Sequence, residues 1–417
     1  MSEATPLRSS KKKRSRKNYT DEEAAVYYEE EEMDHTTRMS IYAGAFFFGI
    51  LTLWFFTIYL PGSFIPAATD LVGIQKITEL DVTLRPINPA RGLEYDFEDE
   101  EELNQELDKE LDHELDQDMD QDMEITRKKG KSRAKSKRTV ERIIMVGDIH
   151  GHYTQFRKLL KKINFRPKVD HLLVLGDFIS KGPDSKKVLE YLIDNNIDCI
   201  LGNHEYYILQ NYAHFHGIDQ PFFVVNGTSE ISRENPFRGK DGFNDDSEFL
   251  LAKKLEPEHV KYINSCSLIK KLGDMPLHKA GKGFSTGIPA VAVHAGIRWD
   301  LELVDQDPID TLEMRSLIGP YYNETTSEPD DENAVSWSKI FNLKQKEKEG
   351  TSEEQLIVYY GHDARRGLNL KPYSRGIDTG CDRGEKLTAM VVWAEHSKGK
   401  NGKQQNLYRE EAVSVHC

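Results

Sequence analysis

Three short apolar runs, each ending in a polar loop, constrain this chain more than any other feature. They have the aliphatic and β-branched character of buried parallel strands, and they occupy residues 143–146, 172–175 and 199–201. The two segments between them, 153–163 and 183–196, have helical periodicity, and Pro183 suits a first helical turn. The pattern predicts a βαβαβ unit. Its polar loops would gather at the carboxyl edge of the sheet, where open α/β folds place their sites.

The loops after these runs carry oxygen and imidazole donors. They read Gly147-Asp148-Ile149-His150-Gly151, Gly176-Asp177 and Gly202-Asn203-His204-Glu205. Any one of these aspartates or histidines alone is more simply explained as a turn residue. Their recurrence in order after three apolar strands instead indicates a site for zinc, manganese or iron.

These motifs resemble those of the calcineurin-like metallophosphatase superfamily. The similarity continues at His294-Ala295-Gly296 and Gly361-His362-Asp363, and it covers roughly residues 143–392. The chain departs from the protein-phosphatase branch where Ser180-Lys181-Gly182-Pro183 stands in place of Asp-Arg-Gly. Lysine there is similar to the ApaH-like phosphatases, relatives of bacterial diadenosine tetraphosphatase. Together with the apolar stretch described below, the pattern resembles the fungal vacuolar zinc-dependent endopolyphosphatases.

The resemblance implies a metallophosphatase fold of the α/β class, with two packed mixed β-sheets flanked by helices. The residues themselves support a layered α/β domain, because further buried strands are expected at 288–293, 356–360 and 389–393.

The resemblance also implies a centre of two divalent metal ions. Zinc is expected, with manganese, cobalt or iron as alternatives. Asp177 would bridge the two ions, and His204 would be the general acid for the leaving oxygen. Lys181 and Arg298 would bind substrate phosphate, with Arg365 and Arg366 as weaker candidates. The remaining ligands that the family implies are Asp148, His150, Asn203, His294 and His362.

Ser180 predicts a preference among phosphate substrates. In the protein phosphatases an aspartate at this place orients the histidine that corresponds to His204. Because a serine cannot stabilise an imidazolium as a carboxylate does, His204 is expected to be a poor general acid. A phosphate leaving an anhydride needs a proton less than an alkoxide does, so anhydrides are expected to be preferred over phosphoserine peptides. Lys181, a mobile point charge, would accept a chain of similar phosphates in several registers.

Residues 41–60 have no charge and are rich in phenylalanine. As a helix they would span about 30 Å, which matches the hydrocarbon core of a bilayer. Forty residues precede them, more than a cleaved signal peptide has before its apolar core. Eight Lys and Arg lie before the stretch, whereas only Lys76 lies within the next twenty residues. The positive-inside rule therefore predicts a transmembrane helix with residues 1–40 in the cytosol and the rest in a lumen.

Residues 61–139 are expected to form a charged lumenal stalk or linker before a catalytic domain at 140–417. An acidic tract at 98–124 precedes a basic tract at 127–138, which is either a flexible linker or a guide for a phosphate chain or a protease site. The whole chain has 56 basic and 70 acidic residues. Residues 141–417 have 36 basic and 41 acidic residues, and a domain with this slight negative charge is not built for nonspecific polyanion binding, so no nucleic-acid partner is expected. An anionic substrate would be attracted locally by metals and nearby basic side chains.

Two modifications are weighed on the lumenal side. Asn226 and Asn323 each begin an N-x-[ST] sequon and are expected glycosylation sites. The four cysteines are few for a domain of this length, so no disulfide scaffold is implied, and Cys199 is interpreted as a buried thiol.

The expected function is a metal-dependent phosphohydrolase that cuts the phosphoanhydride bonds of inorganic polyphosphate. Its expected location, from the resemblance, is the vacuole membrane, with a single-pass anchor and the catalytic domain in the lumen. The alternatives are a lumenal Ser/Thr-type protein phosphatase, a dinucleoside polyphosphate hydrolase and a catalytically inactive scaffold. Because every metal position is filled, the scaffold is the least favoured of them. The sequence indicates no particular oligomeric state.

Overall fold

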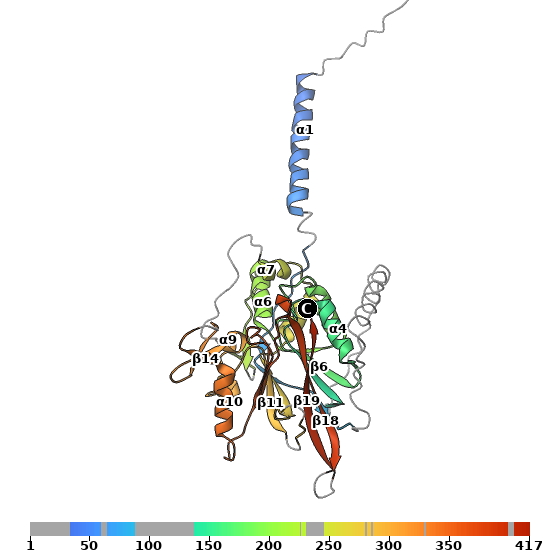
Figure 1. Ribbon diagram of the computed structural model, residues 1–417. Helices are drawn as coiled ribbons and strands as arrows, with labels where there is room; N and C mark the ends of the chain where they lie inside the picture. Colours follow the sequence, from blue (N-terminus) through green and yellow to red (C-terminus); the bar gives the residue numbers. More distant parts are fainter. Residues whose placement is uncertain are drawn as a thin grey trace, which may run out of the picture. The chain divides into compact units, whose positions relative to one another are not determined.

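The computed structural model describes residues 34–59, 65–87, 137–225, 227–230, 246–279, 282–284, 287–328, 331–398 and 404–417 (Figure 1). It divides into two units, Met1–Phe64 and Ile65–Cys417. The first unit is described through α1 (His35–Trp54), which continues as the π-helical turn η1 (Phe55–Tyr59). The helix from His35 to Thr57 is long and apolar enough to cross a membrane. The predicted apolar span therefore coincides with a helix.

The second unit contains a five-stranded sheet with the order β19-β18-β5-β6-β7. Its parallel centre consists of β5 (Arg142–Val146), β6 (Asp170–Val174) and β7 (Asp198–Cys199). The helices α4 (Tyr153–Lys162) and α5 (Ser185–Asp194) connect these strands, which confirms the predicted βαβαβ unit. An antiparallel hairpin extends the sheet beyond β5; its strands are β18 (Lys386–Lys398) and β19 (Gln404–His416).

A six-stranded mixed sheet has the order β16-β17-β15-β11-β10-β2. Its parallel strands β11 and β15 lie at the centre, next to β10 and β17. The bounds are β2 (Ile77–Glu79), β10 (Ile269–Met275), β11 (Ile288–Val293), β15 (Ile357–Tyr360), β16 (Asn369–Lys371) and β17 (Ser374–Gly376).

Smaller elements surround these sheets. The remaining strands are β1 (Ile74–Gln75), β3 (Val82–Leu84), β4 (Arg138–Val140), β8 (Phe223–Val225), β9 (Thr228–Glu230), β12 (Ser316–Ile318), β13 (Glu324–Thr326) and β14 (Ala334–Ser336). The remaining helices are α6 (Asn203–His216), α7 (Ser247–Ala252), α8 (Pro257–Ser265), η3 (Leu303–Asp305), α9 (Pro308–Glu313), α10 (Trp337–Glu347) and η4 (Cys381–Arg383).

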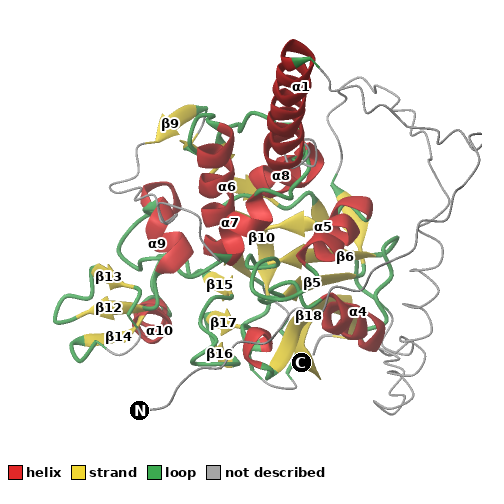
Figure 2. Ribbon diagram, turned by 90° about the horizontal axis from the view of Figure 1, so that it is seen from above, coloured by secondary structure: helices red, strands yellow, loops and turns green. Residues whose placement is uncertain are grey.

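Apolar spacing explains how the layers form. Every residue of β5 is buried, as expected of a strand covered on both faces. In α4 the buried residues Tyr153, Phe156 and Leu160 recur about one turn apart, and this stripe faces the five-stranded sheet. Figure 2 shows α4 and α5 beside that sheet and α10 beside β15 to β17. The layered α/β architecture expected from the sequence is therefore present.

The prediction that Pro183 occupies the first turn of a helix is wrong. Helix α5 begins at Ser185 with Asp184 as its N-cap residue, and Lys181 and Ser180 before it have positive φ. The helix after β6 therefore begins two residues later than the periodicity of the sequence indicated.

The second compact unit begins before residue 140, where the catalytic domain is predicted to start. Residues 65–87 belong to the second unit, where β1 pairs with β8, β2 with β10 and β3 with β4. The strands are two or three residues long, too short to show a periodicity. The acidic tract and most of the basic tract lie outside the described residues, as does the predicted cytosolic arm before residue 34.

The interpretation of Cys199 as a buried thiol is wrong. Cys199 is bonded to Cys266, and Cys381 is bonded to Cys417. A bridge between Ile200 and Ser267 brings the end of β7 beside the residues that follow α8. The partners are 67 and 36 residues apart in sequence, and such spacing has no recognisable pattern.

Candidate metal centre

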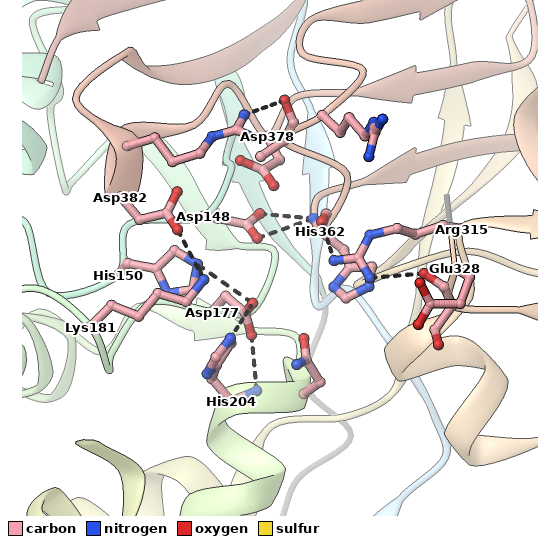
Figure 3. A pocket seen from close by; sticks show the side chains of 15 residues that line it. Asp148, His150, Asp177, Lys181, His204, Arg315, Glu328, His362, Asp378 and Asp382 are labelled. Atoms are coloured by element: carbon pink, nitrogen blue, oxygen red, sulfur yellow. Dashed lines mark hydrogen bonds and ion pairs between the residues drawn. The ribbon is translucent and has the colours of Figure 1, made fainter. Parts of the chain in front are cut away.

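The donors expected from the sequence converge at the carboxyl ends of three parallel strands of the five-stranded sheet and two parallel strands of the six-stranded sheet (Figure 3). They open onto a cavity of about 340 Å³, except His294, which is fully buried. Asp148 and His150 follow β5, Asp177 follows β6, Asn203 opens α6 after β7, His294 follows β11, and His362 follows β15.

Asp177 lies at the middle of this group. Two groups of three donor atoms, one atom from each residue, lie within 4.8 Å of one another. The first group comes from His150, Asp177 and His204, and the second comes from Asp177, His294 and His362. The Oδ1 atom of Asp177 is 3.4 Å from His294 Nε2, whereas its Oδ2 atom is 3.7 Å from His150 Nε2. The two carboxylate oxygens thus face different donor groups, which would suit a ligand shared by two cations.

Hydrogen bonds set which imidazole nitrogens can bind a cation. His294 Nδ1 is 2.8 Å from the carbonyl oxygen of Leu175, so its Nε2 lone pair faces Asp177 and the amide oxygen of Asn203. His362 Nε2 is 3.2 Å from the carbonyl oxygen of Glu313, which leaves its Nδ1 as the ligand atom. Each histidine is oriented through the nitrogen that does not face the centre.

Negative charge is concentrated here. Asp148, Asp177 and Asp378 are all less than 5 % exposed. Burial and the charges of Asp378 and Asp177 raise the pKa of Asp148 well above its usual value. Burial lowers the pKa of His150 to about 4, so its imidazole is neutral at pH 7. Crowded carboxylates and neutral imidazoles are the donor set of a divalent-cation site, and these residues fit two such ions.

The backbone is constrained at the same place. Eight non-glycine residues of the described part have positive φ, and five belong to the site: His150, Asp177, Ser180, Lys181 and His362. Such strain is typical of functional sites. Two glycines permit close packing, because a Cβ on Gly202 would collide with Asp177 and one on Gly361 with Asp148.

Glu205, whose place in the third motif had no assigned role, holds two loops together. Its fully buried carboxylate accepts hydrogen bonds from the backbone of Asp177 at 2.7 Å, Gly202 at 3.0 Å and Ile179 at 3.1 Å. The loops after β6 and β7 are therefore fixed relative to each other.

An outer wall of charged residues from distant parts of the chain completes the cavity. It consists of Arg315, Glu328, Arg365, Asp382 and Arg383. Lys181 lines the cavity, where its Nζ is 3.0 Å from Asp382 Oδ2 and 3.1 Å from His150 Nε2. Arg298 does not line it, because its guanidinium pairs with Asp300, and Arg366 instead pairs with Asp363.

The premise that His204 lacks a carboxylate partner is wrong. Glu248 Oε1 lies 2.6 Å from His204 Nδ1. Burial lowers the pKa of His204, but the charge of Asp177 and the hydrogen bond to Glu248 outweigh burial and raise it above its usual value. Ser180 therefore does not by itself make His204 a poor acid, and the substrate preference drawn from it loses its basis.

Several residues of the site were missed in the sequence. Asp378 had a signal, because it stands in a Gly-x-Asp-x-Gly stretch directly after β17. Arg315 and Glu248 had none, since neither follows a recognisable strand or motif. Of the two sequons, Asn323 is exposed in the turn before β13, and Asn226 lies outside the described residues.

Comparisons with known proteins agree with this geometry. The family model described as calcineurin-like phosphoesterase matches residues 141–265. The zinc-dependent endopolyphosphatase of Saccharomyces cerevisiae is 28 % identical over 291 residues, which cover 66 % of this chain and 80 % of that protein. The symmetrical bis(5′-nucleosyl)-tetraphosphatase of Wigglesworthia glossinidia brevipalpis is 49 % identical over 71 residues, only 26 % of its length.

A solved structure described as a candidate diadenosine tetraphosphatase is similar with a TM-score of 0.46 and 23 % identity, covering 66 % of this chain and 94 % of that one. The family match spans the βαβαβ unit and its three loops. This chain is thus a hydrolase that carries a calcineurin-like metallophosphatase domain.

Proposed function

We propose that the chain hydrolyses the phosphoanhydride bonds of inorganic polyphosphate, using two divalent ions, with zinc as the expected metal. The observation that carries this proposal is the cavity, in which donors for two cations lie beside Lys181 and the arginines of the outer wall. A linear chain of phosphates offers oxygens both to the cations and to several guanidinium groups at once. The similarity to the yeast endopolyphosphatase supports the same substrate.

The ligand set would be Asp148, His150 and Asp177 for one ion, with Asp177, Asn203, His294 and His362 for the other. When bound, two such ions activate water as a nucleophile near neutral pH and neutralise charge on the phosphoryl oxygens. The protein's own part is to hold and orient. Lys181 and the arginines bind the phosphates, and Glu205 fixes the loops that position Asp177.

His204 is the candidate donor to the leaving oxygen. Its ring lines the cavity with Nε2 3.9 Å from Asp177 Oδ2, and Nδ1 is occupied by Glu248. Protonated at Nε2, it would pass a proton to the oxygen that departs when the bridging P–O bond breaks. No covalent bond between enzyme and phosphate is needed for this reaction.

Dinucleoside polyphosphate hydrolysis is the second candidate, favoured by the local similarity to the bacterial tetraphosphatases. A nucleoside is commonly held by stacking on an aromatic ring. Among the described residues that line the cavity, none is Phe, Tyr or Trp. The described lining thus offers several charged groups for phosphates and no Phe, Tyr or Trp ring for a base, which favours polyphosphate.

The direct test compares three substrates of the full chain in detergent. Long polyphosphate, diadenosine tetraphosphate and a phosphoserine peptide are each incubated with zinc or with a chelator, and polyphosphate chain length is followed on a gel. Zinc-dependent shortening of polyphosphate, with the highest kcat/KM of the three, is expected. A higher kcat/KM for either other substrate would replace the proposed function with the corresponding alternative.

We also propose that the catalytic unit lies in the vacuole lumen, anchored by α1. The two disulfides support a lumenal location, because such bonds persist in oxidising compartments. Protease added to sealed vacuoles is expected to remove only about the first forty residues. Digestion of the catalytic unit without detergent would place that unit in the cytosol and contradict this topology.

A further inference from the structure

A carboxylate from a separate helix contacts the ring of His204. Glu248 lies in the first turn of α7, after a segment outside the described residues, and α7 packs beside α6. Its Oε1 atom is 2.6 Å from His204 Nδ1, and both side chains are less than 20 % exposed. The contact is short and shielded, as in a charge-assisted hydrogen bond.

Three groups hold Glu248 itself in place. The Ser180 hydroxyl donates to Oε1 at 2.6 Å, and the Ser247 hydroxyl donates to Oε2 at 3.0 Å. The Glu248 backbone N–H donates to Asp246 Oδ1 at 3.1 Å, as expected at a helix N-terminus. The carboxylate therefore has a fixed orientation before it meets the imidazole.

The other edge of the His204 ring faces the cavity. The backbone N–H of His204 donates to Asp177 Oδ1 at 3.1 Å, which fixes the start of α6 beside the donors. The ring also meets His150 edge-on, with centroids 5.0 Å apart. With Nδ1 donating to Glu248, only Nε2 can reach a substrate in the cavity.

We propose that Glu248 is the positioning residue for His204, and that Ser180 serves it by orienting its carboxylate. The carboxylate function that protein phosphatases have at the place of Ser180 is thus supplied here from 68 residues later in the chain. Glu248 fixes the ring rotamer and keeps the proton of the neutral imidazole on Nδ1. The assignment rests on the proposed function of the site.

The proton balance of the step is simple. Water adds to phosphorus, the bridging P–O bond breaks, and the Nε2 proton of the imidazolium form of His204 passes to the leaving oxygen, which leaves a neutral ring protonated at Nδ1. A proton released from the attacking water returns to Nε2 through solvent. Misplacing the ring should therefore slow substrates whose leaving group needs the proton, and should spare those whose leaving group is a stable anion.

The test uses the full chain in detergent with phenyl phosphate, a poor leaving group, and 4-nitrophenyl phosphate, a good one. We expect Glu248→Ala to lower kcat for phenyl phosphate about 10- to 100-fold, with a smaller loss for 4-nitrophenyl phosphate and little change in KM. Glu347→Gln, at an exposed carboxylate at the end of α10, is the matched control and should change neither. Equal losses with both substrates, or none, would overturn the proposal.

A compensating variant separates positioning from a merely structural role. In the Glu248→Ala background, Ser180→Asp should restore a large part of kcat for phenyl phosphate, because it returns a carboxylate to the neighbourhood of Nδ1. Aspartate tolerates the positive φ at this position better than most residues. A double variant no better than Glu248→Ala would count against the assignment.

The ring state is also measured without turnover. In ¹⁵N-histidine-labelled chain, with His204→Gln to assign the signal, we expect the neutral ring of His204 to be protonated at Nδ1, and this preference to weaken in Glu248→Ala. A ring protonated at Nε2 in the unmodified chain would refute the proposal. If the chain hydrolyses no phosphate compound but shows the Nδ1 tautomer, the proposed function fails while the contact with Glu248 stands.

Discussion

Two sides of the same cavity differ in origin. The loops after β5, β6 and β7 lie within about sixty residues of each other, and their donors point at one another from rigid strand ends. The outer wall comes from η4, the residue before β12 and the loops after β13 and β15, and its side chains pair across the cavity, as Asp382 does with Lys181. We infer that the strand-end loops hold the cations, that Glu248 orients His204, and that the outer wall binds the phosphates.

The largest effect should come from the strand-end loops. Asp177→Asn removes the carboxylate that faces both donor groups, so we expect hydrolysis of polyphosphate to fall by about 10³-fold or more. The circular dichroism spectrum should not change, because the backbone contacts of Asp177 remain. Full activity in this variant would contradict the claim that the strand-end loops hold the cations needed for hydrolysis.

The two disulfides offer a second comparison, because each lies behind one side. Cys381–Cys417 flanks Asp382 and Arg383 of the outer wall, whereas Cys199–Cys266 lies behind the loop of Asn203. Replacing either pair by alanine should lower the free energy of unfolding by about 4 kcal/mol, as loop closure predicts.

Only loss of the Cys381–Cys417 disulfide should also raise KM for polyphosphate, because that loss frees the helical turn η4. Urea unfolding and steady-state kinetics on both double variants provide the two readouts. If removing Cys199–Cys266 raised KM equally, the outer wall would not be the separate substrate-binding side described above.

How far the sequence predicts this site depends on how local each part is. Asp148, His150 and Asp177 could be placed at strand ends because each follows a buried run long enough to identify. Glu248 could not, because α7 has six residues and follows a stretch without periodicity. The strands at residues 74–84 were missed for the same reason, since strands of two or three residues show no pattern and depend on partners far along the chain.

A single arginine of the outer wall should have a moderate effect. Arg383 lines the cavity and donates to the carbonyl oxygen of Ala364 at 2.6 Å. We expect Arg383→Ala to raise KM for long polyphosphate by about tenfold and to change kcat little, since one charged contact is worth about 1.4 kcal/mol. Arg166→Ala, at an exposed pair with Glu141, is the control and should leave both constants unchanged.

Acid should slightly weaken the ion pair between Glu410 and Arg375, which stabilises the strand that leads to the outer wall. Burial raises the pKa of Glu410, but the hydrogen bond with His278 and the charge of Arg375 outweigh it and place the pKa below its usual value of 4.5. Because the unfolded chain then binds protons at higher pH than the folded chain, this stabilisation is present above about pH 4.5 and is lost as pH falls through the folded pKa.

Arg375 lies in β17, and the chain runs from β17 through Asp378 to η4 of the outer wall, so this loss bears on that side of the cavity. Glu410→Gln should lower stability at pH 7 and flatten its dependence on pH below 4.5. Thermal unfolding of both proteins across this range measures the difference. An unchanged acid profile in the variant would mean that other carboxylates account for the loss.

The central claim is that the strand-end donors hold two cations through one shared carboxylate. Equilibrium dialysis of the full chain against zinc, followed by elemental analysis, measures this directly. Two ions per chain are expected in the unmodified protein, and weakened binding of both in Asp177→Asn. One ion or none in the unmodified protein, or two equally tight ions in the variant, would contradict the claim.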